Sequence, residues 1–388
     1  MTAPRKLLLL AGTRPEIIKQ APLHFAAEGN PAWDCRICFT GQHRELGLQM
    51  LGDLGLVADR QLALMQPGQR PADFLGSAVA AIGAVLREER PAWVAVQGDT
   101  TTALAGALAG FYERVPVLHV EAGLRTHNLD LPFPEEGHRQ LIARIASAHA
   151  APTAEAATML RRENIPAGRI LVCGNTGIDC LLRIVRRQQA GGAVPADVPA
   201  GLAGEAQRRH GNIGEPLILV TMHRRESFGP PLAGMCRALA QVAREHPSAL
   251  FALPVHPNPA VQASVQAGLG LLPNFRLIAP QSFTAFTWLM QRSVLLITDS
   301  GGLQEEGPAL GKPVLVLREV TERPEAVAAG GARLIGCKEQ AVYDAVTQLL
   351  VDPDAYRAMA VPRFPYGDGT AAEKILPWLA QLPVPPSA

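Results

Sequence analysis

The stretch AWVAVQGDTTTALAGALAGFYERVPVLHVEAGLRT, residues 92–126, decides the fold class. Two short apolar runs, 92–97 and 115–120, enclose a segment of helical length. Both runs are nearly continuous in apolar residues, which is typical of strands covered on both faces. Joined by a helical crossover, such strands predict an α/β domain with a parallel sheet.

The same alternation continues along the chain, with one interruption. Residues 189–204 are rich in glycine and proline and show no clear periodicity, as an interdomain linker does. We therefore expect two doubly wound Rossmann-like domains, 1–188 and 205–365, and a C-terminal helix and tail, 366–388, packing back on the first domain. The candidate strands are 6–11, 35–40, 92–97, 115–120, 148–152, 169–173, 216–221, 249–254, 275–279, 294–298, 313–317 and 332–335.

Composition excludes several protein classes. Lys and Arg number 36 against 35 Asp and Glu, a net charge of +1, which argues against a nucleic-acid or membrane-surface protein. No stretch approaches the roughly 18 apolar residues that a membrane span needs. The lone C-x-x-C pair, Cys35 and Cys38, lies in a strand-like run whose side chains alternate between faces, so we expect buried thiols and no metal site. Reduced cysteines fit a cytoplasmic protein.

Acidic residues follow the predicted strands of the first half. Ligands of open parallel sheets bind beyond the carboxyl ends of the strands, so chemistry is expected there. Asp99 follows the run 92–97, Glu121 follows 115–120, and Glu135 lies in the string PFPEE. Several carboxylates in one site push their pKa values apart, as paired acid and base roles require. The alternative is that Asp99 only caps a helix and that the other two are solvated surface acids.

The first predicted strand ends in the string GTRPE. Thr13 and Glu16 have the spacing of a capping box at a helix start. Arg14 and Lys19 then lie near a helix N-terminus, whose dipole favours anions. We expect them to contact a phosphate or another substrate anion, and the alternative is two solvated cations.

The second half places histidines and a glycine turn at the predicted strand ends. His223 stands beside Arg224, an arrangement that suits an anion, and His256 follows the next run. The string DSGG, 299–302, exposes backbone N–H groups at a strand-to-helix turn and predicts a phosphate cradle. It is neither a Walker A loop nor G-x-G-x-x-G, so ATP and NAD are not indicated.

These strings together resemble the non-hydrolysing UDP-N-acetylglucosamine 2-epimerases. They occur in the family's order and cover nearly the whole chain, so the set is specific although each string alone is weak. The matching strings are GTRPEIIK (12–19), TGQHRE (40–45), GDTTTALAGALA (98–109), HVEAGLRT (119–126), PFPEE (132–136), GNTGIDCL (174–181), HRRESFG (223–229), VHPNP (255–259), TDSGGLQEEGPALGKPVL (298–315) and TERPEAV (321–327).

The resemblance implies a glycosyltransferase-B-like fold, with two Rossmann-like domains facing each other across a cleft, and a homodimer. It implies inversion at C2 of the sugar without cofactor or metal, through elimination of UDP to 2-acetamidoglucal and re-addition. UDP-N-acetylglucosamine and UDP are the implied ligands. The implied catalytic residues are Asp99, Glu121, Glu135 and His223. The implied substrate and UDP-binding residues are Arg14, Lys19, His256, Phe286 (in a turn, stacked on uracil), Ser300, Gly301, Gly302, Glu306 and Arg323.

The chain departs from the family pattern at a few positions. Ser227, Gly177 and His138 replace residues that the family usually has, but none of the three is an implied catalytic group. Bacterial relatives also hold a second, activating UDP-N-acetylglucosamine. The residues that match positions of that site are Gln42, His43, Gln69, Arg224 and His256, whereas Glu45 and Gly68 fit the pattern less well.

Three other functions remain open from the sequence. A hydrolysing 2-epimerase would use the same carboxylates but release UDP and N-acetylmannosamine. A glycosyltransferase of the same fold needs the nucleotide site of the second domain but not three acids in the first. A non-catalytic UDP-sugar sensor needs no acids at all, so the presence of the whole catalytic set argues against it.

Overall fold

The structure is a computed structural model that describes residues 3–66, 68–210, 212, 214–222, 224 and 228–383. The chain forms two compact units. The first comprises Met1–Leu182 and the returning segment Tyr366–Ala388, and the second comprises Arg183–Pro365.

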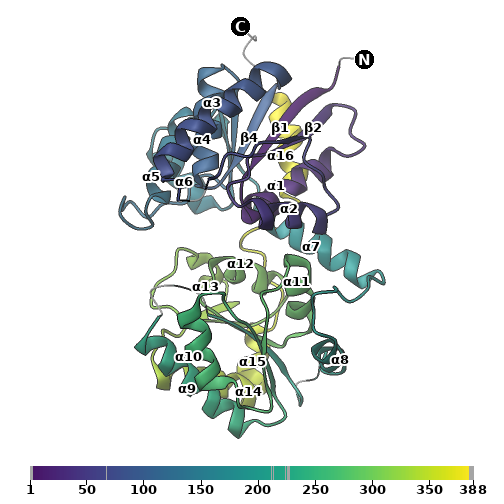
Figure 1. Cartoon of the computed structure of the whole chain (residues 1–388), viewed down its shortest axis with the longest axis vertical. Helices are drawn as coiled ribbons and strands as arrows, with labels where there is room; N and C mark the ends of the chain where they lie inside the picture. The colour runs from purple at the N-terminus through teal and green to yellow at the C-terminus, as the bar shows by residue number, and fades with distance from the viewer. Residues whose placement is uncertain are drawn as a thin grey trace. The chain divides into compact units, whose positions relative to one another are not determined.

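The first unit contains a seven-stranded parallel sheet of order β3-β2-β1-β4-β5-β6-β7. Figure 1 labels three neighbouring strands of this sheet, β2, β1 and β4. Leu7 to Leu10 of the interior strand β1 are at most 1% exposed, so this strand is covered on both faces. The strands are β1 (Arg5–Ala11), β2 (Trp33–Phe39), β3 (Arg60–Gln61), β4 (Trp93–Gln97), β5 (Val117–Val120), β6 (Ala148–Ala151) and β7 (Ile170–Val172).

Helices cover this sheet on both sides. Leu8 and Leu10 of β1 belong to the apolar cluster formed with α3 and α4, whereas the alternate side chains, Leu7 and Leu9, point to the opposite face. The helices of this unit are α1 (Arg14–Ala27), α2 (Arg44–Asp53), α3 (Pro71–Glu89), α4 (Thr101–Tyr112), α5 (Glu135–Ile145), α6 (Ala154–Arg162), the 3₁₀ turn η1 (Ala167–Arg169) and α16 (Ala371–Gln381), with α7 (Thr176–Gln189) running from this unit into the second.

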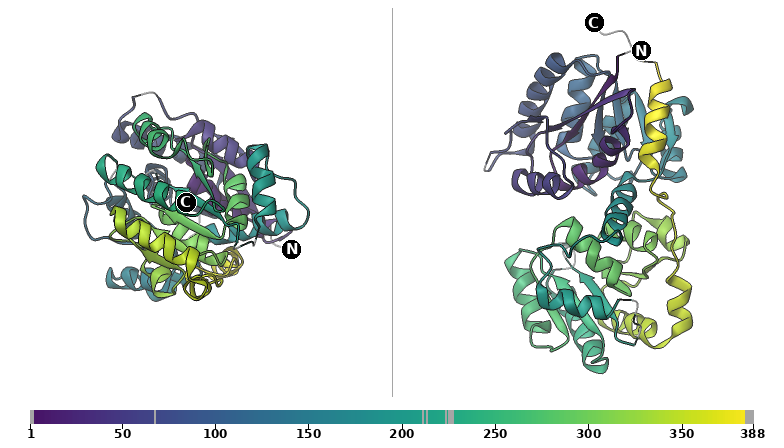
Figure 2. Two further views of the ribbon diagram at one scale, coloured as in Figure 1. Left: turned by 90° about the horizontal axis from the view of Figure 1, so that it is seen from below. Right: turned by 90° about the vertical axis from the view of Figure 1, so that its right-hand side faces the viewer.

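The C-terminal helix α16 packs against α1 of the first unit (Figures 1 and 2). Its start is held by a buried carboxylate, because the backbone N–H of Ala372 donates to Oδ2 of Asp179 at 2.8 Å. An acidic group at a helix N-terminus satisfies N–H donors that have no partner inside the helix.

The second unit contains a six-stranded parallel sheet of order β10-β9-β8-β11-β12-β13. Its strands are β8 (Leu217–Thr221), β9 (Leu250–Pro254), β10 (Phe275–Ile278), β11 (Leu295–Thr298), β12 (Val314–Val316) and β13 (Ala332–Leu334). Its helices are α8 (Ala200–Arg208), α9 (Pro230–Glu245), α10 (Pro259–Leu269), α11 (Phe283–Arg292), α12 (Gly301–Ala309), α13 (Pro324–Ala328), α14 (Glu339–Val351) and α15 (Pro353–Met359).

The predicted fold class, two doubly wound parallel sheets, is confirmed. Some details differ from the sequence-based expectation. The edge strand β3 was not expected, because two residues are too short for a periodic pattern. Helix α7 is continuous to Gln189, so the boundary between the two compact units, after Leu182, falls inside a helix. Helix α8 begins at Ala200, within the expected linker. Across the described ranges, the structure contains no helix with the length and hydropathy of a membrane span.

Candidate active site

Glu121 begins the turn after β5, and side chains of the described residues Lys19, Gln97 and Asn175 hold its carboxylate. The residue adopts a left-handed backbone conformation with φ = 60° and is buried. Its Oε1 accepts hydrogen bonds from Lys19 Nζ at 2.5 Å and from Asn175 Nδ2 at 2.9 Å, and its Oε2 accepts one from Nε2 of Gln97. Donors directed at both oxygens favour an ionised carboxylate with a fixed orientation.

The returning C-terminal segment supports one of these donors. The backbone N–H of Asn175 donates to the carbonyl of Tyr366 at 2.6 Å, and its Oδ1 accepts from the N–H of Gly177. Gly174 allows the close approach, since a Cβ there would lie 2.8 Å from Cα of Gly367. Asn175 is therefore positioned by the start of α7 and by the returning C-terminal segment.

Asp99 follows β4 and pairs with an arginine from α5. Arg139 donates through Nε to Oδ2 of Asp99 at 2.7 Å, and His138 Nδ1 lies 2.7 Å from the Asp99 carbonyl oxygen. The alternative role of Asp99 as a helix cap is wrong, because Thr100 caps α4 by accepting from Ala103 N at 3.0 Å.

The turns that carry Asp99 and Glu121 are close together. A Cβ on Gly98, which precedes Asp99, would lie 3.6 Å from Oε2 of Glu121. The ring of His119 fastens the same turn, since its Nε2 lies 2.8 Å from the carbonyl oxygen of Gly98. Two of the three predicted carboxylates thus stand on neighbouring strand ends, as expected.

Glu135, the third predicted acid, is the first residue of α5 and is half-buried. Its neighbour Glu136 is fully buried and accepts hydrogen bonds from the backbone N–H groups of Thr126 and His127 and from Gln140. Burial raises the pKa of Glu136, but these hydrogen bonds outweigh it and hold the pKa below its usual value. Glu136 therefore braces the loop that precedes Glu135.

Glu16 has a larger role than the sequence indicated. Its Oε2 accepts from the N–H of Thr13 at 2.8 Å, as the predicted capping box requires, and also from the N–H of Gly12. Its Oε1 accepts from Thr100 Oγ1 at 2.6 Å, which ties the turn after β1 to the turn after β4. Complete burial raises the pKa of Glu16 to about 7.

The other predicted residues of the first unit lie around these turns. Arg14 is exposed at the first position of α1, and His43 is exposed after β2. Gln42 accepts from Thr102 Oγ1 at 2.8 Å, so it lies against the turn after β4. Gln69 lies in the loop before α3, where its Oε1 accepts from the N–H of Gln66.

In the second unit, the predicted phosphate cradle forms the start of α12. Ser300 is the N-cap residue, yet its side chain makes no capping hydrogen bond. Arg323 lies directly over the turn, because a Cβ on Gly301 would approach its Cζ to 3.1 Å. A helix N-terminus, a hydroxyl group and a guanidinium group thus converge where an anion is stabilised.

Carboxylates fix the cation of this turn. Arg323 Nε donates to Glu305 Oε1 at 2.9 Å, and its Nη1 lies 3.3 Å from Glu322 Oε1. Burial raises the pKa of Glu322, but Arg323 and Arg318 outweigh it and lower the pKa to about 2. Arg224, a candidate activator residue, lies 3.6 Å from the same Glu322, and its backbone N–H donates to Asp299.

The remaining predicted residues of this unit have mixed outcomes. His256 is half-buried after β9, and its Nδ1 accepts from the N–H of Asn258. Glu306 is half-buried within α12. Phe286 was expected in a turn. It lies instead in helix α11, where it is half-buried. His223 lies outside the described residues.

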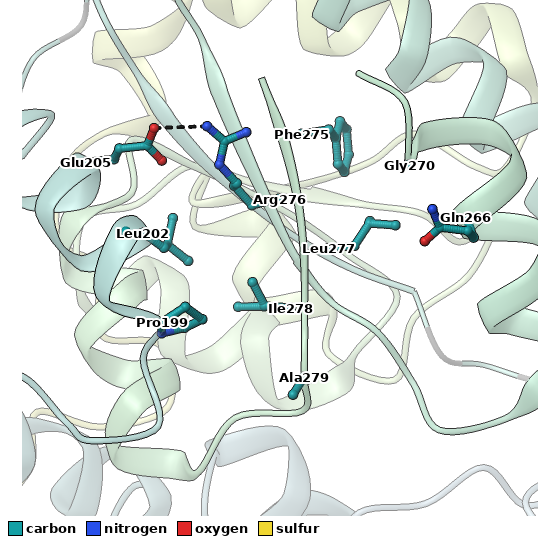
Figure 3. Close-up of a pocket in the computed structure, with 11 residues that line it drawn as sticks. Pro199, Leu202, Glu205, Gln266, Gly270, Phe275, Arg276, Leu277, Ile278 and Ala279 are labelled. Carbon is teal, nitrogen blue, oxygen red and sulfur yellow. Dashed lines mark hydrogen bonds and ion pairs between the residues drawn. The ribbon is translucent and has the colours of Figure 1, made fainter. Parts of the chain in front are cut away.

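A groove of about 700 Å³ runs along the edge strand β10 (Figure 3). It contains none of the predicted site residues, and apolar side chains such as Leu202 and Phe275 line it. Its charged groups neutralise each other, because Arg276 Nη2 lies 2.9 Å from Glu205 Oε1. The candidate chemistry therefore lies at the strand ends and not in this groove.

Sequence comparisons identify the family of the chain. A family model described as UDP-N-acetylglucosamine 2-epimerase matches residues 26–380. The chain belongs to this family. A curated UDP-N-acetylglucosamine 2-epimerase of Salmonella typhimurium is 44% identical over 371 residues, covering 96% of this chain and 97% of the relative. The predicted family and enzyme class are thereby confirmed.

Solved structures of the family are also similar to this chain. The UDP-GlcNAc 2-epimerase of Neisseria meningitidis, bound to UDP-GlcNAc, has a TM-score of 0.87 and 38% identity, covering 97% of this chain and 100% of that chain. The UDP-GlcNAc 2-epimerase of Methanocaldococcus jannaschii, in complex with UDP-GlcNAc and UDP, has a TM-score of 0.78 and 29% identity, covering 97% and 99%.

Proposed function

We propose that this epimerase interconverts UDP-N-acetylglucosamine and UDP-N-acetylmannosamine by inversion at C2, without releasing free sugar. The observation that carries the proposal is the Glu121 carboxylate, buried at a strand end and held by Lys19, Gln97 and Asn175. The solved relatives bound to UDP-GlcNAc and to UDP support the choice of substrate.

The proposed reaction has two balanced steps. In the elimination, a base takes the proton from C2 while the bond between C1 and the UDP oxygen breaks, giving 2-acetamidoglucal and UDP. In the re-addition, an acid protonates C2 from the opposite face and the UDP oxygen rejoins C1. A base, an acid and cations for the diphosphate are needed, and no electrons are exchanged with a cofactor.

The described residues supply groups of each kind. Glu121 and Asp99, on neighbouring strand ends, are proposed to serve proton transfer near C2, together with Glu135 and His223. The start of α12 in the second unit is proposed to hold the nucleotide. There Ser300 offers a hydroxyl group that caps no helix, and Arg323 offers a fixed cation.

Product analysis in D₂O separates this proposal from hydrolysis. Proton NMR of the protein with UDP-N-acetylglucosamine is expected to show UDP-N-acetylmannosamine, with deuterium at C2 and the sugar still joined to UDP. Stoichiometric UDP and free N-acetylmannosamine would instead identify a hydrolysing enzyme. Activity is expected to survive exhaustive chelation without added metal or NAD. Loss of activity restored by a divalent ion would contradict the metal-free reaction.

The activator site, the homodimer and the cytoplasmic location remain predictions. The activator site is predicted to use Gln42, His43, Gln69 and Arg224, which lie after β2, before α3 and after β8. Sedimentation of the purified protein, with and without UDP-N-acetylglucosamine, tests the dimer.

A further inference from the structure

A small pocket in the second unit gathers positive charge. It has a volume of about 280 Å³, and Arg292, Lys312 and His210 line it. Arg292 ends α11 three residues before β11, and Lys312 lies two residues before β12. The pocket is therefore at the amino ends of these strands, opposite the carboxyl ends where Ser300 and Gly301 stand.

Within the described part of the chain, the cations of this pocket have no acidic partner. Among the described residues, neither Arg292 nor Lys312 forms an ion pair, and no carboxylate lies close enough to raise the pKa of either. The polar contacts of both are to neutral carbonyl oxygens, from Arg292 Nη1 to Trp288 at 3.1 Å and from Lys312 Nζ to Gln291 at 2.8 Å. The Nε of Arg292 is buried without a hydrogen-bond partner.

The positive groups also repel one another. Burial, followed by the charge of Arg292, lowers the pKa of Lys312 to about 8. Partial burial of the ring, and then the charges of Lys312 and Arg292, lower the pKa of His210. Burial is the largest cause of each shift, and the neighbouring positive charges lower the pKa values of Lys312 and His210 further. The Arg276–Glu205 pair in the neighbouring groove shows the usual alternative, in which a carboxylate neutralises the cation.

Two local features reduce this repulsion but do not remove it. Arg292 lies 3.6 Å over the ring of Trp288, a cation–π contact. Lys312 and Arg292 also lie at the C-terminus of α11, whose dipole is equivalent to roughly half a negative charge. Half a charge does not balance two cations, and an unpartnered buried guanidinium N–H remains.

We propose that this pocket binds a phosphate group as a dianion, at a site separate from the nucleotide turn. Two charges on the ligand match the two cations, and several oxygens allow donors on different elements to bind the same group. The Arg292 guanidinium group, Lys312 Nζ and the His210 ring are the donors, from α11, the turn before β12 and the segment that follows α8. The ligand is free phosphate or a small phosphomonoester. The ester is included because the volume of the pocket exceeds that of one phosphate group.

Calorimetric titration tests the site. The full-length protein is titrated with inorganic phosphate and with glycerol 3-phosphate, with UDP present to occupy the nucleotide turn. The ester binding more tightly than phosphate would identify an organic phosphate as the ligand, and the reverse order would identify free phosphate. Succinate, a dicarboxylate dianion, is expected to bind at least tenfold more weakly than the better of the two. Equal binding of succinate would overturn the assignment to phosphate.

Variants tie the binding to this pocket. Lys312→Met is expected to weaken phosphate binding about tenfold to a hundredfold, the usual effect of losing a charge-assisted hydrogen bond. His210→Gln, at an exposed position, tests the same pocket if Lys312→Met destabilises the fold. Lys338→Met, which removes an exposed lysine at the start of α14, is the control and is expected to bind like wild type. The proposal is overturned if phosphate does not bind, or binds wild type and both pocket variants equally.

Discussion

The ammonium group of Lys19 lies 2.5 Å from Oε1 of Glu121, which joins helix α1 to the end of β5. The pair links a cation expected to bind the nucleotide with a carboxylate expected to act on the sugar. Both side chains are largely withdrawn from water, at 21% and 6% exposure, so the attraction is screened little by solvent. Replacing Lys19 would therefore alter binding and chemistry together, and other residues separate the two roles more cleanly.

Asp99→Asn tests the chemical role of the first-unit acids. The amide keeps the shape but removes the charge and the basicity, and it weakens the pair with Arg139. Removing a positioned acid or base typically lowers the rate by about 10²–10⁴. We expect kcat to fall by that order while UDP affinity, measured by calorimetry, changes little. Deuterium incorporation at C2 at the wild-type rate would exclude Asp99 from proton transfer. Asp344→Asn on α14 is the matched control.

Ser300→Ala tests the nucleotide turn. The Ser300 hydroxyl makes no capping hydrogen bond within α12, so its loss removes a ligand contact without removing a helix cap. A hydrogen bond to a charged phosphate contributes roughly 1–3 kcal/mol. We expect UDP to bind about tenfold to a hundredfold more weakly. Ser264→Ala, on α10, is expected to bind UDP normally. Unchanged affinity in Ser300→Ala would place the phosphates elsewhere.

Gln97→Met tests the support of Glu121. The substitution preserves volume and removes the donor to Oε2 of Glu121. One donor fewer disfavours the ionised carboxylate, so kcat/KM is expected to fall about tenfold and its acidic limb to move to higher pH. Gln241→Met, on the exposed side of α9, should leave the pH profile unchanged. A fall in kcat/KM without any movement of the profile would indicate a structural role only.

The sequence predicts the sheets and the strand ends because both are local patterns. The run 92–97 and the acid that follows it can be recognised without knowing any neighbour. The donors around Glu121 could not be predicted in this way, since Lys19 and Asn175 lie 102 and 54 residues from it. Only the strand order, with β4 between β1 and β5, brings these segments together. Among these donors, only Gln97 could be noticed locally, as a polar residue at the end of a buried apolar run.

The pocket lined by Arg292, Lys312 and His210 was not predicted from the sequence, for a related reason. Ligands of open parallel sheets are expected beyond the carboxyl ends of the strands, whereas Arg292 and Lys312 lie before the amino ends of β11 and β12. An isolated cation near a turn is usually solvated. The sequence alone does not show whether a carboxylate lies close to it in space. The contact of Glu16 with Thr100 was also not predicted, because the capping-box spacing gave a sufficient local explanation for Glu16.

Two core histidines are expected to lower the stability of the fold in acid. Burial lowers the pKa of His119 to about 4 and that of His149 to about 3, below the value of about 6.5 in an unfolded chain. Since the folded state disfavours the protonated rings, the free energy of unfolding falls as the pH drops below 6.5. Between pH 7 and pH 5, the free energy of unfolding of His149→Phe is expected to fall by about 2 kcal/mol less than that of wild type. Urea unfolding at pH 7, 6 and 5 measures it, with His246→Gln as control. Parallel curves for wild type and His149→Phe would contradict the assignment.

Glu16→Gln is expected to act in the opposite direction. The folded-state pKa of Glu16, about 7, lies above the unfolded value of 4.5, so its contribution to stability is full below pH 4.5 and is lost as the pH rises to 7. A glutamine fits the same contacts: its carbonyl can accept from Gly12 and Thr13, and its amide can donate to Thr100 Oγ1, reversing one hydrogen bond. We therefore expect Glu16→Gln to be more stable than wild type by up to about 3 kcal/mol at pH 8, with little difference at pH 4.5. Glu155→Gln, in the first turn of α6, provides the control for charge removal. Urea unfolding at both pH values decides the matter, and a variant less stable than wild type at pH 8 would show that Glu16 is needed there as a carboxylate.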